Sequence, residues 1–361
     1  MKSYFKLLAL FFSISVFVSC GNADDDVNFG LNTGGDLGKG KPVDDCLELG
    51  ENDLILSIQD QYTTEPGKVS VFFKVSNADG NPVPGLTADE FTIYEQGQND
   101  DCFNTISKSE ANSRISPNSQ IFSNNTLLVL DLSASVLTTS LAELKTASAS
   151  FIGNVMPATT QESFKMAIYW FDGEDVLHEL NPLTANKAEL TAAVEGITAD
   201  ISQDVSTDLY GAVIKSTDIA SNLLIESTKG EKIGAASVVI FTDGTDQASR
   251  FTKEAAQQKV DTANPNISFF TIGLGAEIDT QVLTDIGKTS SVVANNKEEL
   301  ETTFNNISEL VSRRASSFYL FEYCSPKRSG DNNLAIQVTK GGVQGAVQTK
   351  FNATGFAGGC L

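Results

Sequence analysis

Short apolar runs alternate with segments of helical periodicity across residues 124–314, and this alternation constrains the fold more than any other feature of the sequence. Uninterrupted apolar runs are typical of strands buried on both faces of a sheet, and intervening helices supply the crossovers that parallel strands need. The pattern therefore predicts a doubly wound α/β domain with a mostly parallel sheet. The expected strands are 126–131, 164–171, 176–180, 237–243, 267–275 and 291–295, and the expected helices are 141–155, 185–195, 208–224, 250–260, 279–286 and 297–313.

The two flanking segments, 46–118 and 316–361, show a different pattern. Runs rich in β-branched and aromatic residues are separated by turns rich in Gly and Pro, which predicts strands. The expected strands are 54–59, 69–76, 91–96, 317–323, 334–339 and 346–351. Two arrangements are open: the flanks complete one all-β, sandwich-like module into which the α/β domain is inserted, or they form two separate small β-domains.

Residues 1–19 are typical of an export signal, because two lysines precede an apolar run that is short for a membrane-spanning helix. The sequence that ends at Cys20 resembles a bacterial lipobox, which implies cleavage before Cys20 and a lipid on its thiol. An ordinary secretory signal is the alternative. Residues 20–45 are rich in Gly, Asp and Asn and predict a disordered tether. We therefore expect a lipid-anchored protein of the bacterial cell envelope, at the outer membrane and either periplasmic or surface-exposed.

The charge balance of the chain is strongly acidic, with 25 Lys and Arg against 46 Asp and Glu and a net charge of −21. Such a balance argues against a nucleic-acid backbone or an anionic membrane surface as the partner. Contact with a membrane is expected through the N-terminal lipid only.

Four cysteines follow the lipobox, and an even number in an exported chain predicts two disulfides without fixing their connectivity. The candidates are Cys46, Cys102, Cys324 and Cys360. Cys102 and Cys324 lie on either side of the α/β segment and are suited to pin its base. No cysteine or histidine cluster has zinc spacing, and His178 is the one histidine, so a transition-metal site built on imidazole is nearly excluded.

Polar side chains follow the first strand of the α/β segment, in the sequence DLSAS. Asp131 ends the strand, and Ser133 and Ser135 follow at alternate positions. In open parallel sheets, ligands bind beyond the carboxyl ends of the strands. Oxygen donors suit a hard divalent ion such as Mg²⁺. Capping of the next helix is the alternative. Asp243, at the end of a later strand, and Thr207, at the start of a helix, favour the ion site.

The segments DLSAS, STDLYGA and VVIFTDG occur in this order on a strand and helix rhythm that resembles the von Willebrand factor A (VWA) domain with an intact metal-ion-dependent adhesion site (MIDAS). The resemblance covers about 190 residues. It implies that Ser133, Ser135 and Thr207 supply hydroxyl oxygens to Mg²⁺, with Mn²⁺ or Ca²⁺ as alternatives, and that Asp131 and Asp243 contribute charge directly or through water. One departure is Val205-Ser206, where many relatives have two glycines, so Ser206 is an alternative to Thr207.

The resemblance also implies the mode of binding, in which an exposed Asp or Glu of a protein ligand completes the metal shell. We therefore expect a binding protein and not an enzyme. A Ser-His-Asp hydrolase would depend on His178, which is expected far from the DLSAS loop. The alternative function is a structural or assembly component of the envelope whose α/β domain is a metal-independent scaffold. Asp172 is assigned to a turn, and Asp246 is expected to cap helix 250–260 or to be solvated.

Overall fold

The computed structural model describes residues 40–116, 122–202, 204–230, 232–276 and 278–359. The predicted signal segment, its Cys20 lipidation site and most of the predicted tether lie outside the described residues. In the described part of the chain, the model contains no helix with the length and apolar character needed to cross a membrane.

The central sheet has six strands in the order β11-β10-β9-β6-β7-β8. All neighbouring strands are parallel except β7 and β8, which are antiparallel. The predicted mostly parallel sheet is therefore confirmed. Its strands are β6 (Phe122–Asp131), β7 (Phe164–Phe171), β8 (His178–Thr184), β9 (Ile233–Thr242), β10 (Ile267–Leu274) and β11 (Ser290–Ala294).

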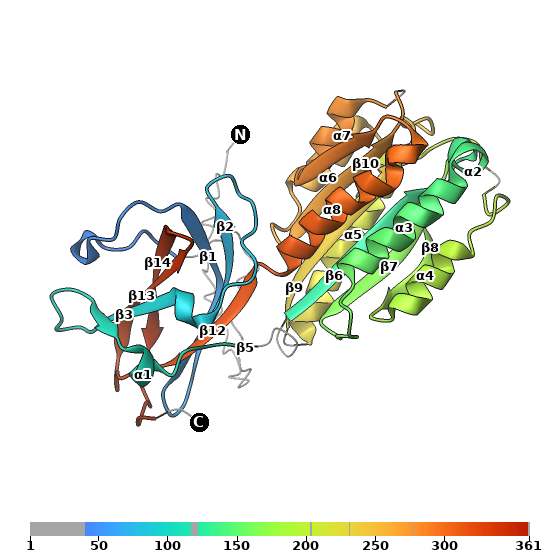
Figure 1. Cartoon of the computed structure of the whole chain (residues 1–361). Helices are drawn as coiled ribbons and strands as arrows, with labels where there is room; N and C mark the ends of the chain where they lie inside the picture. The colour runs from blue at the N-terminus through green and yellow to red at the C-terminus, as the bar shows by residue number, and fades with distance from the viewer. Residues whose placement is uncertain (1–39, 117–121, 203, 231, 277, 360–361) are drawn as a thin grey trace, which may run out of the picture. The chain divides into compact units, whose positions relative to one another are not determined.

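Helices cover both faces of this sheet, as expected for a doubly wound domain (Figure 1). One core contains Phe151 of α3, Leu190 of α4 and Phe304 of α8, and the other contains Val213 of α5 and Val260 of α6. The helices are α2 (Ala134–Thr139), α3 (Leu141–Val155), α4 (Lys187–Glu195), α5 (Leu209–Lys229), α6 (Lys253–Asp261), α7 (Thr280–Ile286) and α8 (Leu300–Ala315), with the 3-10 turn η4 (Lys297–Glu299) before α8.

Two antiparallel sheets form the β part of the chain, in the orders β1-β2-β12-β5 and β14-β13-β3-β4. Each combines strands that precede the α/β segment with strands that follow it. The two sheets share one core of aliphatic and aromatic side chains. The elements are η1 (Asp45–Leu47), β1 (Leu54–Thr64), β2 (Lys68–Asn77), η2 (Ala88–Glu90), β3 (Phe91–Gln96), β4 (Asn104–Ile106), α1 (Lys108–Ala111), β5 (Arg114–Ser116), β12 (Phe318–Cys324), β13 (Asp331–Lys340) and β14 (Val343–Asn352).

The disulfide of the β part joins Cys46 to Cys102. The predicted pairing of Cys102 with Cys324 at the base of the α/β segment is therefore wrong. The physical reason is that Cys324 ends β12 in one sheet, whereas Cys102 precedes β4 in the other. Cys324 is also disulfide-bonded, and Cys360 lies outside the described residues.

A buried glutamate lies in the core shared by the two antiparallel sheets. Glu95 is on β3, its side chain is fully buried, and the hydroxyl of Tyr323 on β12 donates a hydrogen bond to its Oε1 atom at 2.8 Å. Burial raises the pKa of Glu95 by more than the neighbouring hydrogen bonds and positive charges lower it. The folded state therefore favours the protonated carboxyl more strongly than the unfolded chain does.

Replacing Glu95 by glutamine is expected to stabilise the β-sheets at neutral pH. Because the folded-state pKa of Glu95 lies above the unfolded value, its contribution to stability is complete below the unfolded pKa and is lost as pH rises through the folded pKa. The amide does not ionise, so the Glu95→Gln variant keeps its stability over this interval. Hydrogen exchange of the β12 and β13 amides at acidic and neutral pH measures the difference. Equal losses in variant and wild type would contradict the prediction.

Candidate metal-binding site

The first part of the candidate site is the loop that leaves β6. Leu127 to Leu130 are fully buried, so β6 ends inside the domain and its last residue, Asp131, is also fully buried. One oxygen of the Asp131 carboxylate accepts a hydrogen bond from the backbone N–H of Ser133 at 3.0 Å. The other accepts one from the Thr242 hydroxyl at 2.6 Å. The loop after β6 and the last residue of β9 therefore fix this carboxylate from two sides.

Hydroxyl groups connect Asp131 to the end of β9. The Oγ atoms of Ser133 and Ser135 lie 3.2 Å apart, and Ser135 donates a hydrogen bond to the Asp243 carboxylate at 3.0 Å. Asp243 directly follows β9. The side chains of Ser133, Ser135 and Asp243 thus meet at the carboxyl ends of two adjacent parallel strands.

The loop before α5 forms the third part of the site. Thr207 is buried, and its carbonyl oxygen accepts hydrogen bonds from the backbone N–H groups of Gln247 and Ala248, at 2.8 and 3.1 Å. Its hydroxyl lies 4.0 Å from the position that a Cβ on Gly244 would occupy. The Thr207 hydroxyl is therefore next to the residue that follows Asp243.

The hydroxyl of Ser206, the alternative donor, is already engaged. It donates a hydrogen bond to the Asp204 carboxylate at 2.7 Å, and the backbone N–H of Ser206 donates to the same oxygen at 2.9 Å. Its Oγ also lies where a Cβ on Gly173 would be, on the side of the β7–β8 turn. These contacts favour Thr207 over Ser206 as the third hydroxyl.

The electrostatic environment of Asp131 disfavours an isolated negative charge. Burial raises the pKa of Asp131 to about 7, the charge of Asp243 acts in the same direction, and the hydrogen bonds from Thr242 and Ser133 act against it. Among the described residues, no cationic side chain contributes to this balance. A buried carboxylate beside a second carboxylate fits a bound cation, which would supply the missing positive charge.

The donor set fits a hard divalent cation. The loops bring together two carboxylates and three hydroxyls, all of them oxygen donors. Asp131, Ser133 and Thr207 are buried, whereas Asp243 is partly buried and Ser135 is exposed. The site is thus deep on one side and open to solvent on the other. Beside it lies a hollow of about 310 Å³, lined by Thr139, Ser140, Asp243, Leu274, Gly275, Ala276, Asn296 and Lys297.

Two supporting residues were missed or misjudged by sequence reasoning. Thr242, which donates to Asp131, was assigned no role, although its place one residue before Asp243 at the end of a strand was a usable signal. Asp246 does not cap α6, because the Thr252 side chain does so. The Asp246 carboxylate instead accepts hydrogen bonds from the backbone N–H groups of Tyr210 and Ser249, and so ties the start of α5 to the loop after β9.

Comparison with models of protein families identifies the domain that contains these loops. The model of the von Willebrand factor type A domain matches residues 125–312. The chain belongs to this family. The predicted VWA fold is therefore confirmed, and the three loops described above lie within the VWA domain. A search of curated proteins found no match to the sequence.

Several solved structures are similar to this chain at low identity. The mussel byssus protein PTMP1, with a zinc-occupied MIDAS motif, is 13% identical over 54% of this chain and 50% of that chain, with a TM-score of 0.44. BatB from Bacteroides thetaiotaomicron is 16% identical over 54% and 99%, with a TM-score of 0.42. The vWF domain of the pilus tip protein Mfa5 from Porphyromonas gingivalis is 13% identical over 53% and 95%, with a TM-score of 0.40. The chain spans about half the length of the mussel protein.

Proposed function

We propose that this protein is a cell-envelope lipoprotein that binds a protein ligand through a divalent-cation-dependent adhesion site. The ligands of the cation are Asp131, Ser133, Ser135, Thr207 and Asp243. VWA domains are generally interaction modules, which supports a binding role over a catalytic one. The observation that carries the proposal is the network of oxygen atoms that joins the loops after β6 and β9 around the buried Asp131 carboxylate, with the Thr207 hydroxyl next to Gly244.

The mode of binding follows from charge and exposure. When bound, the cation would supply a positive centre. Three neutral hydroxyls and two carboxylates would leave one coordination position of this cation for a further oxygen ligand. Thr242 and the backbone N–H of Ser133 hold the Asp131 carboxylate in place. Ser135 lies at the exposed side. An Asp or Glu of the partner fits this opening as a charge-assisted ligand.

The hollow beside Asp243 supports a protein partner over a free carboxylate. Its lining combines apolar groups such as Leu274 with the polar side chains of Asn296 and Lys297. Side chains that flank the partner's acidic residue fit here and would set specificity, because affinity for the cation alone does not distinguish one acidic residue from another.

The envelope location rests on the sequence before the described residues. In this proposal Cys20 carries a lipid, and the Gly- and Asp-rich segment that follows connects the anchor to the folded part. Mg²⁺ is the proposed cation, since the donors are oxygen atoms only, with Mn²⁺ and Ca²⁺ as the alternatives of similar chemistry.

Capture of partners from envelope extract tests metal dependence. We expect the immobilised full-length protein to retain a specific partner in excess Mg²⁺, to release it in EDTA, and to recover it when Mg²⁺ is restored. The physical reason is that the partner's carboxylate is bound through the cation. Retention of the same partner in EDTA would contradict the proposal and would favour a metal-independent scaffold in envelope assembly.

A further inference from the structure

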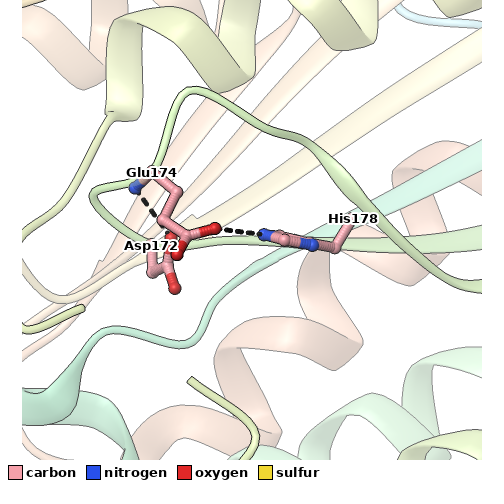
Figure 2. Close-up of side chains that lie close together, drawn as sticks. All are labelled: Asp172, Glu174 and His178. Carbon is pink, nitrogen blue, oxygen red and sulfur yellow. Dashed lines mark hydrogen bonds and ion pairs between the residues drawn. The ribbon is translucent and has the colours of Figure 1, made fainter. Parts of the chain in front are cut away.

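Three potential metal ligands meet at the turn between β7 and β8. Asp172 directly follows β7, Glu174 lies in the turn, and His178 begins β8. One ligating atom from each side chain lies within 4.8 Å of the other two. Figure 2 shows the carboxylate of Glu174 pointing toward the ring of His178, with Asp172 beside it. These residues are distinct from the five of the adhesion site.

Two of the three groups are held in place. Asp172 is 1% exposed, and its carboxylate oxygens accept hydrogen bonds from the backbone N–H of Glu174 at 2.8 Å and from the Ser202 hydroxyl at 2.6 Å. The ring of His178 stacks on Trp170, with centroids 4.0 Å apart and an angle of 11° between the planes. Contacts of this kind orient the side chains that bind a metal ion. The Glu174 side chain is 53% exposed and is free to adjust.

The Nε2 atom of His178 is the observation that points to a ligand. This atom is buried, and among the described residues it makes no hydrogen bond. Burying a polar atom without a partner costs free energy, so such atoms are rare in folded proteins. The closest acidic oxygen, Oε2 of Glu174, is 3.7 Å away, which is too long for a hydrogen bond.

The spacing suits an ion between the two atoms. In a tetrahedral zinc site with bonds of about 2.0–2.2 Å, neighbouring ligand atoms lie about 3.3–3.6 Å apart. The Nε2 to Oε2 distance of 3.7 Å is close to this value, and the exposed Glu174 side chain can adjust its position relative to the other two ligands. One imidazole with two carboxylates is a donor set that suits Zn²⁺, whereas Mg²⁺ prefers oxygen ligands alone.

We propose that Asp172, Glu174 and His178 form a second cation site, selective for Zn²⁺ and independent of the adhesion site. Three protein ligands leave a fourth position for water or for a group of a bound partner. The sequence argued against an imidazole site because the chain has one histidine, yet this site needs only one. The proposal does not depend on metal binding at Asp131.

The single histidine makes a direct test possible. The full-length protein, labelled with ¹⁵N-histidine and kept in excess Mg²⁺, gives one set of imidazole signals, and we expect Zn²⁺ to shift the Nε2 resonance at a ratio of one ion to one chain. Titration calorimetry measures the affinity. His178→Phe keeps an aromatic ring on Trp170 but removes the nitrogen, and is expected to weaken Zn²⁺ binding at this site by at least about tenfold, as loss of an outer-shell contact already costs about 10–100-fold.

Two control variants test whether Zn²⁺ binds at this cluster and not elsewhere on the protein. Glu179→Gln changes an acidic side chain on the same strand that is outside the cluster, and Asp131→Ala changes the adhesion site; both are expected to retain Zn²⁺ binding. If His178→Phe does not fold, Glu174→Gln serves instead, because its side chain is exposed. An imidazole signal that Zn²⁺ leaves unchanged would overturn the proposal and leave the histidine as a plain ion-pair partner of Glu174. Equal affinity in wild type and variant would overturn it as well.

Discussion

The Asp131→Ala variant is expected to lose Mg²⁺ binding at the adhesion site by at least about 100-fold, and with it the Mg²⁺-dependent capture of partner. Removing this carboxylate takes away one of the two negative charges of the site, and the one that is fully buried. A lost buried charge contact costs about 3 kcal/mol or more, which is a factor of about 100 in affinity. Titration calorimetry with Mg²⁺ alone measures the first effect, and the envelope capture assay measures the second.

The fold of the Asp131→Ala variant is expected to survive. Because burial raises the pKa of Asp131 to about 7, the carboxylate is not a source of stability for the metal-free protein at neutral pH. Asp218→Ala is the matched control, since Asp218 is an aspartate of α5 that pairs with Lys259 away from the site. Normal partner capture by the folded Asp131→Ala variant would show that the adhesion site does not mediate binding.

The Phe304→Ala variant is expected to destabilise the VWA domain by about 3–5 kcal/mol, the usual cost of deleting a large buried aromatic side chain. Phe304 lies on α8 and is fully buried. Its ring centroid lies 6.1 Å from that of Phe151 on α3 and 5.7 Å from that of Phe241 on β9. The substitution therefore leaves a cavity where two helices meet the sheet (Figure 1).

Tryptophan fluorescence measures the loss of stability of the VWA domain. Trp170 is the one tryptophan of the sequence and lies on β7, so urea unfolding followed by its emission reports the VWA domain. Ile225→Ala is the control, because Ile225 is 53% exposed on α5 and its truncation is expected to cost less than about 0.5 kcal/mol. If both variants lowered the free energy of unfolding equally, the packing described for α8 would be wrong.

The sequence predicted the α/β sheet well because the signal for it is local. The run from Leu127 to Leu130 is apolar at every position and fully buried. The last helix has apolar residues at helical spacing, and all four lie in the core: Leu300, Phe304, Ile307 and Val311. Each of these segments carries its own pattern, so neither depends on knowing its neighbours.

The pairing of the flanking strands could not be predicted in the same way. Alternating apolar residues locate a strand but do not say which strand lies beside it, because partners such as β2 and β12 are separated by the whole α/β segment. The pairing of the cysteines could not be predicted for the same reason. Cys46 pairs with Cys102 because two loops of the folded sheets bring them together, and no spacing in the sequence expresses that proximity.

Some residues of the candidate site could also be predicted from the sequence, whereas others depend on how the strands pair. The residue types and strand ends predicted which loops would meet, and the side chains of Ser133, Ser135 and Asp243 do lie together. The contribution of Thr242 depends on the register between β6 and β9, which the sequence does not give. The cluster around His178 depends on a turn that returns the chain toward Asp172, and on the stacking of one ring on Trp170.

The strand order of the two antiparallel sheets has a consequence for folding during synthesis. β12 lies between β2 and β5, and β13 lies between β14 and β3, so each sheet lacks one of its two inner strands until the residues after 316 have emerged. The VWA segment is contiguous and can fold first. Until then β2 and β3 have open edges, which invite pairing with other chains. A nascent chain that has emerged up to residue 316 is therefore expected to hold a folded VWA domain and unpaired strands that are prone to aggregation.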